Sequence, residues 1–403
     1  KVTLKASIMD TNIPIQESGN TYELNEFDRV FITLESDKWK LNAGDIYLNN
    51  STTKYLNFNK KVSGLQLQTH FKNAKSNWGF ETSGAIVKGK YNKIEFTGIE
   101  GNQGPYPLSN FTNKYILILS GTEEVYINGN LLKRGENNDY IIDYNTAEII
   151  FNTTFPVTSA MRFQVEYQYN NRDYTQFTTY NSINYKNKKF NISTYFYNEN
   201  DLKNQSLNQN LTNEQKQILA NAGNNNEAMF SPSAQVTEFS EDKILYKKVI
   251  KNSGFYYEYS TNETDSLYTV SFLYVGDNLG DYTLNKVIST GKIFKFVGTN
   301  LGNYIAAKQL IAPKKLQLAV VNGGYSPTLK TKVNFEAAIS NNDKNLYSSI
   351  DDKNNVGVAT KIGLTQVLLN KQWEITNTTN FEYIADNFNS IERIQEIEFN
   401  RNW

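Results

Sequence analysis

Strict alternation of apolar and polar residues is the feature that most limits what this chain can fold into. In MRFQVEYQY, from Met161 to Tyr169, every second residue is apolar, and Arg162, Gln164, Glu166 and Gln168 lie between them. Successive side chains of a strand point to opposite faces of a sheet, so the pattern predicts a strand with one buried and one wet face. Strand patterns are many in the 403 residues, and helix-period patterns are scarce. We therefore expect a mainly β chain of tandem antiparallel, sandwich-like β modules with a short helical insertion.

Two hairpins are expected just before this strand. Asn128-Gly129 separates the apolar residues 125–127 from residues 130–132. An Asn-Gly pair between apolar runs is the strongest short hairpin signal, because both turn positions favour positive φ. A second pair of strands is expected at 140–144 and 148–151, around Asn145-Thr146.

One helix is predicted. Thr212 and Gln215 have the spacing of a capping box, and Gly223 can end the helix in the left-handed conformation. Residues 198–227 around it are rich in Asn and Gln. We interpret them as a helical insertion or linker between β regions, and as the element that protrudes to contact a partner. The alternative is an arm that orders only on binding.

An internal repeat indicates that one structural device recurs. YVGDNLGDY at 274–282 matches FVGTNLGNY at 296–304, and FTGIEGNQGPY at 96–106 is a looser copy. Each copy leads from a strand into a Gly-rich loop closed by Gly-x-Tyr, and glycine permits tight, positive-φ backbone. We predict structural loops at Gly101, Gly104, Tyr106, Gly276, Gly280, Tyr282, Gly298, Gly302 and Tyr304.

These patterns predict five regions. They are an N-terminal β region (1–110), a small antiparallel β domain (111–175), a strand pair with the helical insertion (176–245), a β module with the repeated loops (246–335), and a C-terminal β region (336–403). Residues 395–403 have strand character, so we expect the natural chain to continue past Trp403.

Composition argues against several classes of function. The 41 basic and 41 acidic residues balance, whereas nucleic-acid binding needs a basic surplus. The chain has no Cys, which excludes thiolate metal sites and disulfides, and its one His is His70. No G-x-S-x-G motif accompanies His70, and the Gly-rich loops lack the Lys and the following helix of a phosphate-binding loop. We expect no cofactor, no small-molecule substrate and no catalytic residues.

Calcium is the most plausible ion, because it needs only oxygen ligands. The weak candidates are Asp277, Asp281, Asp343 and Asp351, none of which has the spacing of a known calcium loop. Turns capped by Asp and Asn side chains explain the same residues more simply.

Several blocks in order resemble a known family. They are GNQGPYPL at 101–108, the run from Tyr115 to Phe151, LTNEQKQILANAG, VGDNLGDY, SNNDKNLYSS and EFNRNW. Together they are similar to the Plug component of the type 9 secretion translocon of Bacteroidota. The resemblance implies a protein docked against the periplasmic end of a giant outer-membrane β-barrel, whose pore it closes, and it implies no catalytic residues. One departure is Ala147, where a turn favours Gly.

We therefore expect an exported protein of the periplasm, associated with the outer membrane through protein contacts. The start at Lys1 agrees with removal of a signal peptide. Three alternatives stay open. Aromatic runs such as residues 255–259 permit a surface glycan-binding protein, the strand-like end permits the soluble N-terminal part of an outer-membrane β-barrel protein, and the acidic residues permit a glycoside hydrolase.

Overall fold

The computed structural model divides the chain into two compact units. Unit 1 holds residues 1–209, 313–343 and 352–403, and unit 2 holds residues 210–312 and 344–351. The described residues are 2–9, 29–87, 89–108, 117–119, 121–144, 146–153, 155–170, 173–206, 209–251, 254–288, 290–370, 373–395, 397 and 399.

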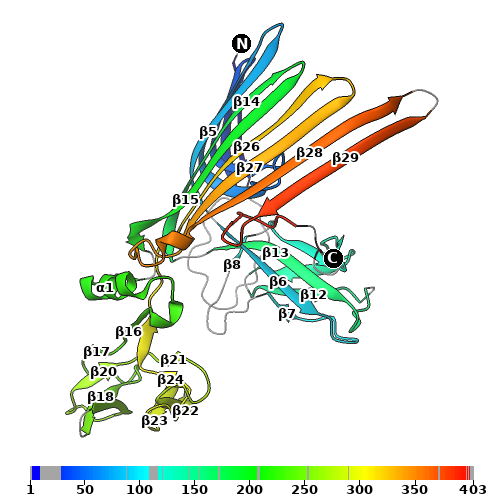
Figure 1. The fold of residues 1–403 in the computed structure, drawn as a ribbon. Helices are drawn as coiled ribbons and strands as arrows, with labels where there is room; N and C mark the ends of the chain where they lie inside the picture. Colours follow the sequence, from blue (N-terminus) through cyan, green and yellow to red (C-terminus); the bar gives the residue numbers. More distant parts are fainter. Residues whose placement is uncertain are drawn as a thin grey trace. The chain divides into compact units, whose positions relative to one another are not determined.

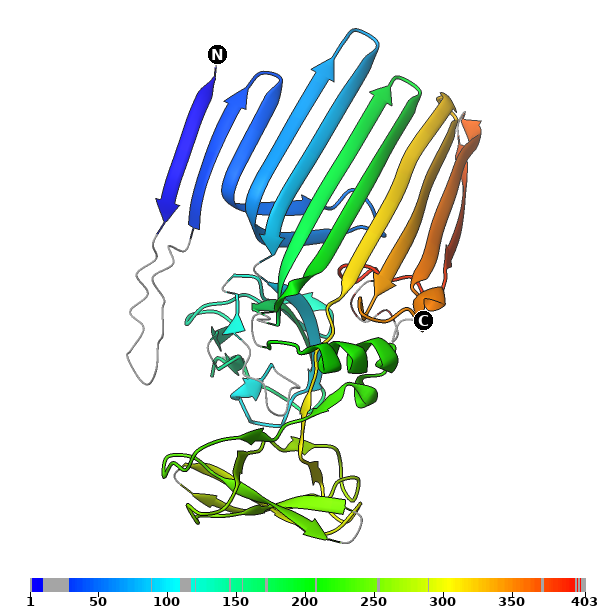
Figure 2. The same cartoon turned by 90° about the vertical axis from the view of Figure 1, so that its left-hand side faces the viewer.

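An antiparallel sheet of eleven strands dominates unit 1 (Figure 1). Neighbouring strands follow chain order, with long insertions after the fifth and the seventh strand. Tight turns join the strands at one end, here called the hairpin end, and the longer connections leave from the other, here called the module end (Figure 2). The strands are β1 (Thr3–Met9), β2 (Arg29–Ser36), β3 (Trp39–Asn50), β4 (Phe58–Lys72), β5 (Ser76–Val87), β14 (Tyr174–Asn187), β15 (Phe190–Ser206), β26 (Lys315–Thr328), β27 (Thr331–Asp343), β28 (Val356–Asn370) and β29 (Glu374–Ile384), and a 3-10 turn, η2 (Asp352–Asn354), precedes β28.

The first insertion, between β5 and β14, forms a small β domain within unit 1. It has a five-stranded and a three-stranded sheet around one apolar core that includes Ile149, Phe163 and Val165. The five strands are β6 (Lys90–Thr97), β8 (Leu117–Ile118), β9 (Glu124–Ile127), β10 (Asn130–Leu131) and β13 (Arg162–Asn170), and the three are β7 (Tyr106–Pro107), β11 (Tyr140–Asp143) and β12 (Glu148–Phe151).

Unit 2 contains α1 (Asn213–Ala222) and three small antiparallel sheets. Buried Leu219 of α1 packs with Met229 and Leu310. The other elements are η1 (Asn226–Ala228), β16 (Phe230–Pro232), β17 (Gln235–Val236), β18 (Tyr246–Lys251), β19 (Gly254–Tyr259), β20 (Leu267–Thr269), β21 (Leu273–Tyr274), β22 (Tyr282–Ile288), β23 (Gly291–Phe296), β24 (Tyr304–Ile305) and β25 (Ala307–Gln309).

The mainly β fold class is confirmed, with several antiparallel sheets and, among the described residues, one α-helix. The helix begins after Thr212, and its reciprocal capping box with Gln215 forms as predicted. The hairpin at Asn128-Gly129 is also confirmed, with φ of 46° and 89° at the two turn positions. None of the helices in the described part of the chain has both the length and the apolar character needed to span a bilayer.

The predicted division into five consecutive regions differs from the structure. The eleven-stranded sheet draws strands from residues 3–87, 174–206, 315–343 and 356–384, so segments far apart in the chain share one sheet. Local sequence patterns show where strands lie, but they do not show that a whole domain has been inserted into a hairpin. For this reason the boundaries at 110, 245 and 335 do not mark compact units.

Two local predictions were wrong. The polar face of β13 is not wet, because Gln164, Glu166 and Gln168 are buried against other parts of unit 1. Residues 198–206, assigned to the insertion, form the end of β15. Of the strand-like terminus at 395–403, residues 396, 398 and 400–403 lie outside the described residues.

Candidate functional site

The two faces of the eleven-stranded sheet are chemically different. The inner face carries Phe58 and Tyr197, which are buried, and the outer face carries Leu65 and Ile183, which are exposed. At the module end, the inner face is covered by residues 51–57, which connect β3 to β4, and by the segment that follows β29. This covered inner face is the candidate functional site.

The connection at residues 51–57 crosses the inner face and bonds to strands far along the sheet. The Tyr55 backbone N–H donates to Glu336 Oε1 on β27 (2.8 Å), and the Tyr55 hydroxyl donates to Glu382 Oε1 on β29 (3.0 Å). The Thr52 and Tyr195 hydroxyls lie 2.9 Å apart. The connection thus links β3 and β4 to β15, β27 and β29, which fixes the curl of the sheet around it.

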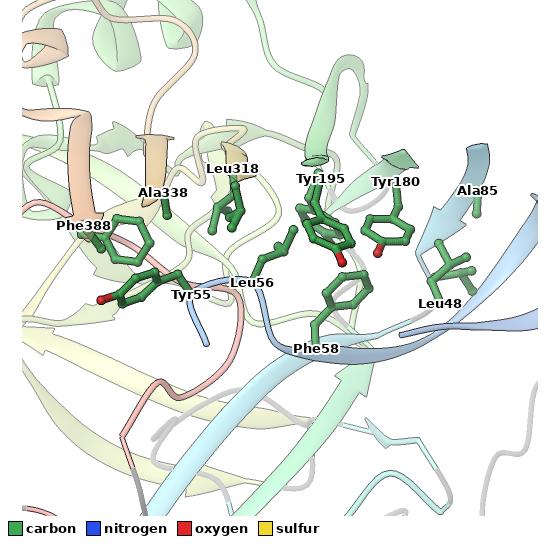
Figure 3. Close-up of a cluster of buried hydrophobic side chains, with 14 of the residues drawn as sticks. Leu48, Tyr55, Leu56, Phe58, Ala85, Tyr180, Tyr195, Leu318, Ala338 and Phe388 are labelled. Carbon is green, nitrogen blue, oxygen red and sulfur yellow. The ribbon is translucent and has the colours of Figure 1, made fainter. Parts of the chain in front are cut away.

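An apolar core lies under this connection (Figure 3). Tyr55, Leu56 and Phe58 are almost fully buried and face the sheet residues Leu318 and Tyr180. Phe388, which follows β29, packs edge-on against Tyr55 with ring centroids 5.7 Å apart. The chain therefore fills the space behind the sheet with its own side chains at this end.

A buried ion pair reinforces the same region. The Lys60 ammonium on β4 bonds to the Glu199 carboxylate on β15, which also accepts from the Tyr197 hydroxyl. Burial alone would raise the pKa of Glu199, but the adjacent Lys60 ammonium outweighs burial and the pKa lies below its ordinary value. Burial likewise opposes the charge on Lys60, and Glu199 outweighs it, so the pKa of Lys60 is raised. Both groups stay charged at neutral pH.

The segment after β29 joins the sheet to the small β domain. Arg393 forms an ion pair with Glu166 on β13 (Nε to Oε1, 2.7 Å), and its guanidinium lies over the Tyr126 ring. Glu392 accepts from the Asn59 backbone N–H (3.0 Å). Burial, with a smaller contribution from Glu166, raises the pKa of Glu392 to about 7.

Glu124, Glu166 and Glu392 line one cavity of unit 1, which is the arrangement that a glycoside hydrolase would need. Glu166 is held by Arg393 and by the Gln164 amide (2.6 Å), and Glu124 accepts from the Tyr126 hydroxyl (2.5 Å). Both carboxylates are therefore hydrogen-bonded or ion-paired to neighbouring side chains where the small domain meets the C-terminal segment.

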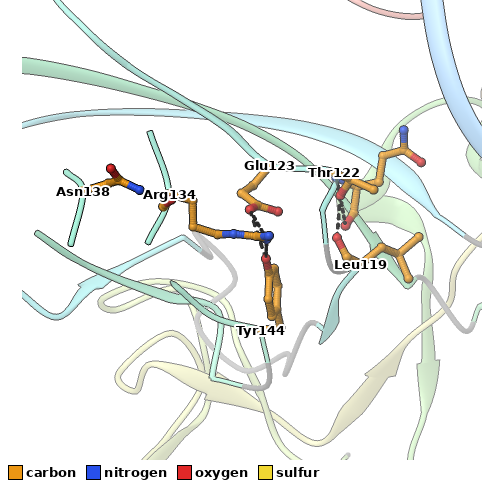
Figure 4. Close-up of polar contacts among 7 residues, drawn as sticks. Leu119, Thr122, Glu123, Arg134, Asn138 and Tyr144 are labelled. Carbon is orange, nitrogen blue, oxygen red and sulfur yellow. Dashed lines mark hydrogen bonds and ion pairs between the residues drawn. The ribbon is translucent and has the colours of Figure 1, made fainter. Parts of the chain in front are cut away.

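The run from Tyr115 to Phe151, one of the blocks on which the family resemblance rests, contains a polar cluster that the sequence patterns did not indicate (Figure 4). Glu123, whose side chain is 3% exposed, accepts from Arg134 Nη1 (2.8 Å) and from the Tyr144 hydroxyl (3.0 Å). Nearby, the Thr122 hydroxyl donates to the Leu119 carbonyl (2.7 Å). Glu123, Arg134 and Tyr144, from the GTEEVY, KRGE and DYNT stretches, thus link the hairpins of the small domain.

The two close copies of the repeat pair with each other in unit 2. The Gly280 and Gly302 backbones exchange two hydrogen bonds of 2.8 Å, and the Asp281 and Asn303 N–H groups donate to the carbonyls of Tyr304 and Tyr282. A Cβ at Gly302 would lie 2.4 Å from the Tyr282 carbonyl oxygen, so only glycine fits. The repeat is therefore one pseudo-symmetric structural unit.

The third copy lies apart from this pair, in the small domain of unit 1. Its Tyr106 hydroxyl donates to the Asn102 carbonyl (2.8 Å) and accepts from the Ile99 N–H (3.0 Å). Gly101 and Gly104 have φ of 70° and 119°, which glycine adopts freely. Gly276 and Gly298 in the paired copies also have positive φ.

The calcium candidates do not form one cluster in the described residues. Asp281 Oδ1 accepts from the Asn300 N–H (3.1 Å), and Asn303 Oδ1 does the same for Asn278 (3.3 Å). Asn303 takes in one copy of the repeat the position that Asp281 takes in the other. The role that the two side chains share is therefore to accept a hydrogen bond from the backbone of the opposite copy. Asp277 accepts from the Tyr274 hydroxyl (3.1 Å), and no group of three or more potential metal ligands is found in the described part of the chain.

The other two calcium candidates, Asp351 and Asp343, also lie at positions that are part of the local fold. Asp351 Oδ2 accepts from the Asn224 N–H (2.8 Å), just beyond α1, and Asp343 ends β27. Asn345, in the same SNNDKNLYSS block, donates to the carbonyls of Leu219 and Gly223 (2.7 and 2.6 Å). This block therefore caps the C-terminal end of α1 within unit 2.

Comparison with known proteins finds one family match. Residues 91–171, about a fifth of the chain, match a family described as a domain of unknown function (DUF8818). The match coincides with the small β domain from β6 to β13. No curated protein matches the chain. This chain thus carries, between β5 and β14, a segment similar to the DUF8818 domain.

Proposed function

We propose that this chain is a non-enzymatic plug that binds and occludes the periplasmic end of a large outer-membrane translocation barrel of the type 9 secretion system. The observation that carries the proposal is the filling of the inner face at the module end by residues 51–57 and by Phe388. A body that closes a pore wide enough for folded proteins must have no passage through itself. The resemblance of the sequence blocks supports the choice of partner.

The strands make such a body stiff. β4, β15 and β28 have 15, 17 and 15 residues and are paired on both sides along most of their length. A rigid body loses little conformational freedom when it docks, so even a modest interface can hold it. Rigidity therefore suits a plug that must seat and leave repeatedly.

A reversible contact also calls for a polar surface, and α1 offers one. Its residues Asn213, Glu214 and Gln217 are exposed, whereas Leu219 is buried in unit 2. Polar, hydrogen-bonding rims are typical of interfaces that form and separate. We propose this exposed side of α1 as one contact with the translocation barrel.

Outer-membrane permeability tests the proposal. In cells that retain the translocation barrel, removal of this protein should admit a large antibiotic that wild-type cells exclude, and re-expression should restore exclusion. Cells lacking both this protein and the barrel are the matched control and should exclude the antibiotic again. Equal exclusion with and without this protein, with the barrel present and empty of substrate, would contradict the proposal.

A further inference from the structure

The outer face of the eleven-stranded sheet is largely apolar from one edge to the other. Side chains paired across the strands in one row include Leu41, Leu67, Phe196, Ile339 and Val358. The polar members of this row are Thr82 and Asn181, whose side chains bond to each other (2.7 Å). Many of the large apolar side chains on this face are exposed, with Leu65 at 57% and Ile339 at 47%. Contiguous exposed apolar surface on this scale is rare in soluble proteins and marks a contact surface.

Away from the module end, where Asp45, Lys61, Lys315 and Asp343 lie on the outer face, the charged residues of the same strands point the other way. Side chains alternate between the faces, and the register places Glu81, Lys332, Glu336, Lys361 and Glu382 on the inner face. On β27, for example, inner Lys332, Asn334 and Glu336 alternate with outer Val333 and Phe335. Toward the hairpin end the sheet is thus polar inside and apolar outside, which is the reverse of the pattern of a sheet that covers a soluble core.

Aromatic rings border the apolar band at the hairpin end. Trp78, Tyr185, Phe190 and Tyr325 lie on four successive strands and contact each other in turn, with centroids 4.6, 6.5 and 6.5 Å apart. The Tyr185 hydroxyl accepts from Asn187, which adjoins the turn, so this ring has its polar group toward the hairpin end. Aromatic belts with this orientation are typical of the boundary between hydrocarbon and headgroups.

The dimensions and charges of the band fit the same environment. The outer residues of β15 are apolar or small from Phe190 to Phe196, and Asn198 follows, so the band is roughly 20 Å tall at about 3.3 Å per residue. Beyond the aromatic rings, the turns carry Lys38, Lys75, Lys188 and Lys330. Lysines at this level complement the phosphates of anionic headgroups.

From these observations we infer that the outer face is a lipid-contacting surface, with acyl chains against the apolar band and anionic headgroups around the lysine turns. A protein partner would meet a compact patch with a polar rim, whereas this band crosses all eleven strands. The inference goes beyond the proposed function, in which the chain reaches the membrane only through protein contacts.

Single cysteines test the inference, because the chain has none of its own. Val321→Cys places a nitroxide label on the outer face of β26, and Asn322→Cys places it on the inner face one residue away. The labelled 403-residue chain is added to vesicles of phosphatidylcholine and phosphatidylglycerol. We expect the label at 321 to be several-fold more accessible to oxygen than to a water-soluble nickel chelate, and the label at 322 to show no such preference. Ile362→Cys and Lys361→Cys repeat the comparison on β28.

Charge reversal tests the headgroup contact. Lys75→Glu with Lys188→Glu should weaken binding to these vesicles at least tenfold, at roughly 1 kcal/mol per lysine near the surface. Lys292→Glu with Lys295→Glu, on β23 of unit 2, is the matched control and should leave binding unchanged. A chain that stays with the aqueous fraction, or labels at 321 and 322 that respond alike, would overturn the inference. These results need no translocation barrel, so they are independent of the plug proposal.

Discussion

Gly280 and Gly302 show at the scale of single residues why the repeat exists. Their backbones approach so closely that a Cβ at Gly302 would meet the Tyr282 carbonyl oxygen at 2.4 Å, and one at Gly280 would lie 2.5 Å from the Tyr304 backbone. We expect Gly302→Ala to lower the free energy of unfolding of unit 2 by about 1–3 kcal/mol, since the two backbones must move apart.

Gly254→Ala is the matched control, because a Cβ there meets no atom within 4 Å and its backbone has no positive φ. Chemical denaturation of the two variants and the parent chain measures the difference. Equal stability of the two variants would show that the close approach of the repeats does not hold unit 2 together.

The buried pair of Lys60 and Glu199 gives a second prediction. Glu199→Gln leaves the Lys60 ammonium buried without its counter-charge, so we expect unit 1 to lose about 3–5 kcal/mol of unfolding free energy. The exposed pair of Lys5 and Glu35 is the comparison, and Glu35→Gln should cost less than about 1 kcal/mol. Urea denaturation of both variants tests this, and a similar small loss in each would contradict it.

Residue patterns predicted the local structure of this chain well where the signal was local. The Asn128-Gly129 turn and the capping box of Thr212 form as expected, because a few neighbouring residues determine them. The polar face of β13 could not be predicted, since Glu166 is buried by Arg393, more than two hundred residues away in sequence. The curl of the sheet around Tyr55 likewise depends on contacts with Glu336 and Glu382, which no local pattern contains.

At the scale of elements, the segment after β29 is held by a carboxyl group whose protonation changes with pH. Burial raises the pKa of Glu392 to about 7, so the folded protein favours the protonated form. The stabilising contribution of this group is therefore complete below its ordinary pKa of about 4.3 and is lost as the pH rises through about 7.

Glu392→Gln should remove this pH dependence. The amide keeps an acceptor for the Asn59 N–H, and we expect the variant to be more stable than the parent chain at pH 8 by roughly 1–3 kcal/mol and nearly equal to it at pH 4.5. Melting temperatures across this range measure the effect. Parallel curves for the two proteins would mean that Glu392 is not buried against the small domain.

At the scale of the whole molecule, the chain combines a sheet whose inner face is filled at the module end by its own residues with insertions that leave from that same end. The inner face supports the proposed plug, and the apolar outer face supports contact with lipid. The sequence resemblance pointed to the first role. The second could be recognised only once the register showed that the outer residues of eleven strands form one continuous surface.

Purification from native membranes tests the plug proposal most directly. The tagged full-length protein is extracted in mild detergent from cells of the natural host, and the proteins that accompany it are quantified by mass spectrometry. We predict that one very large outer-membrane barrel protein accompanies it in equal amount, and that this barrel is free of secreted substrate. Recovery of the tagged protein without such a barrel, or only with barrels that carry substrate, would contradict the proposed function.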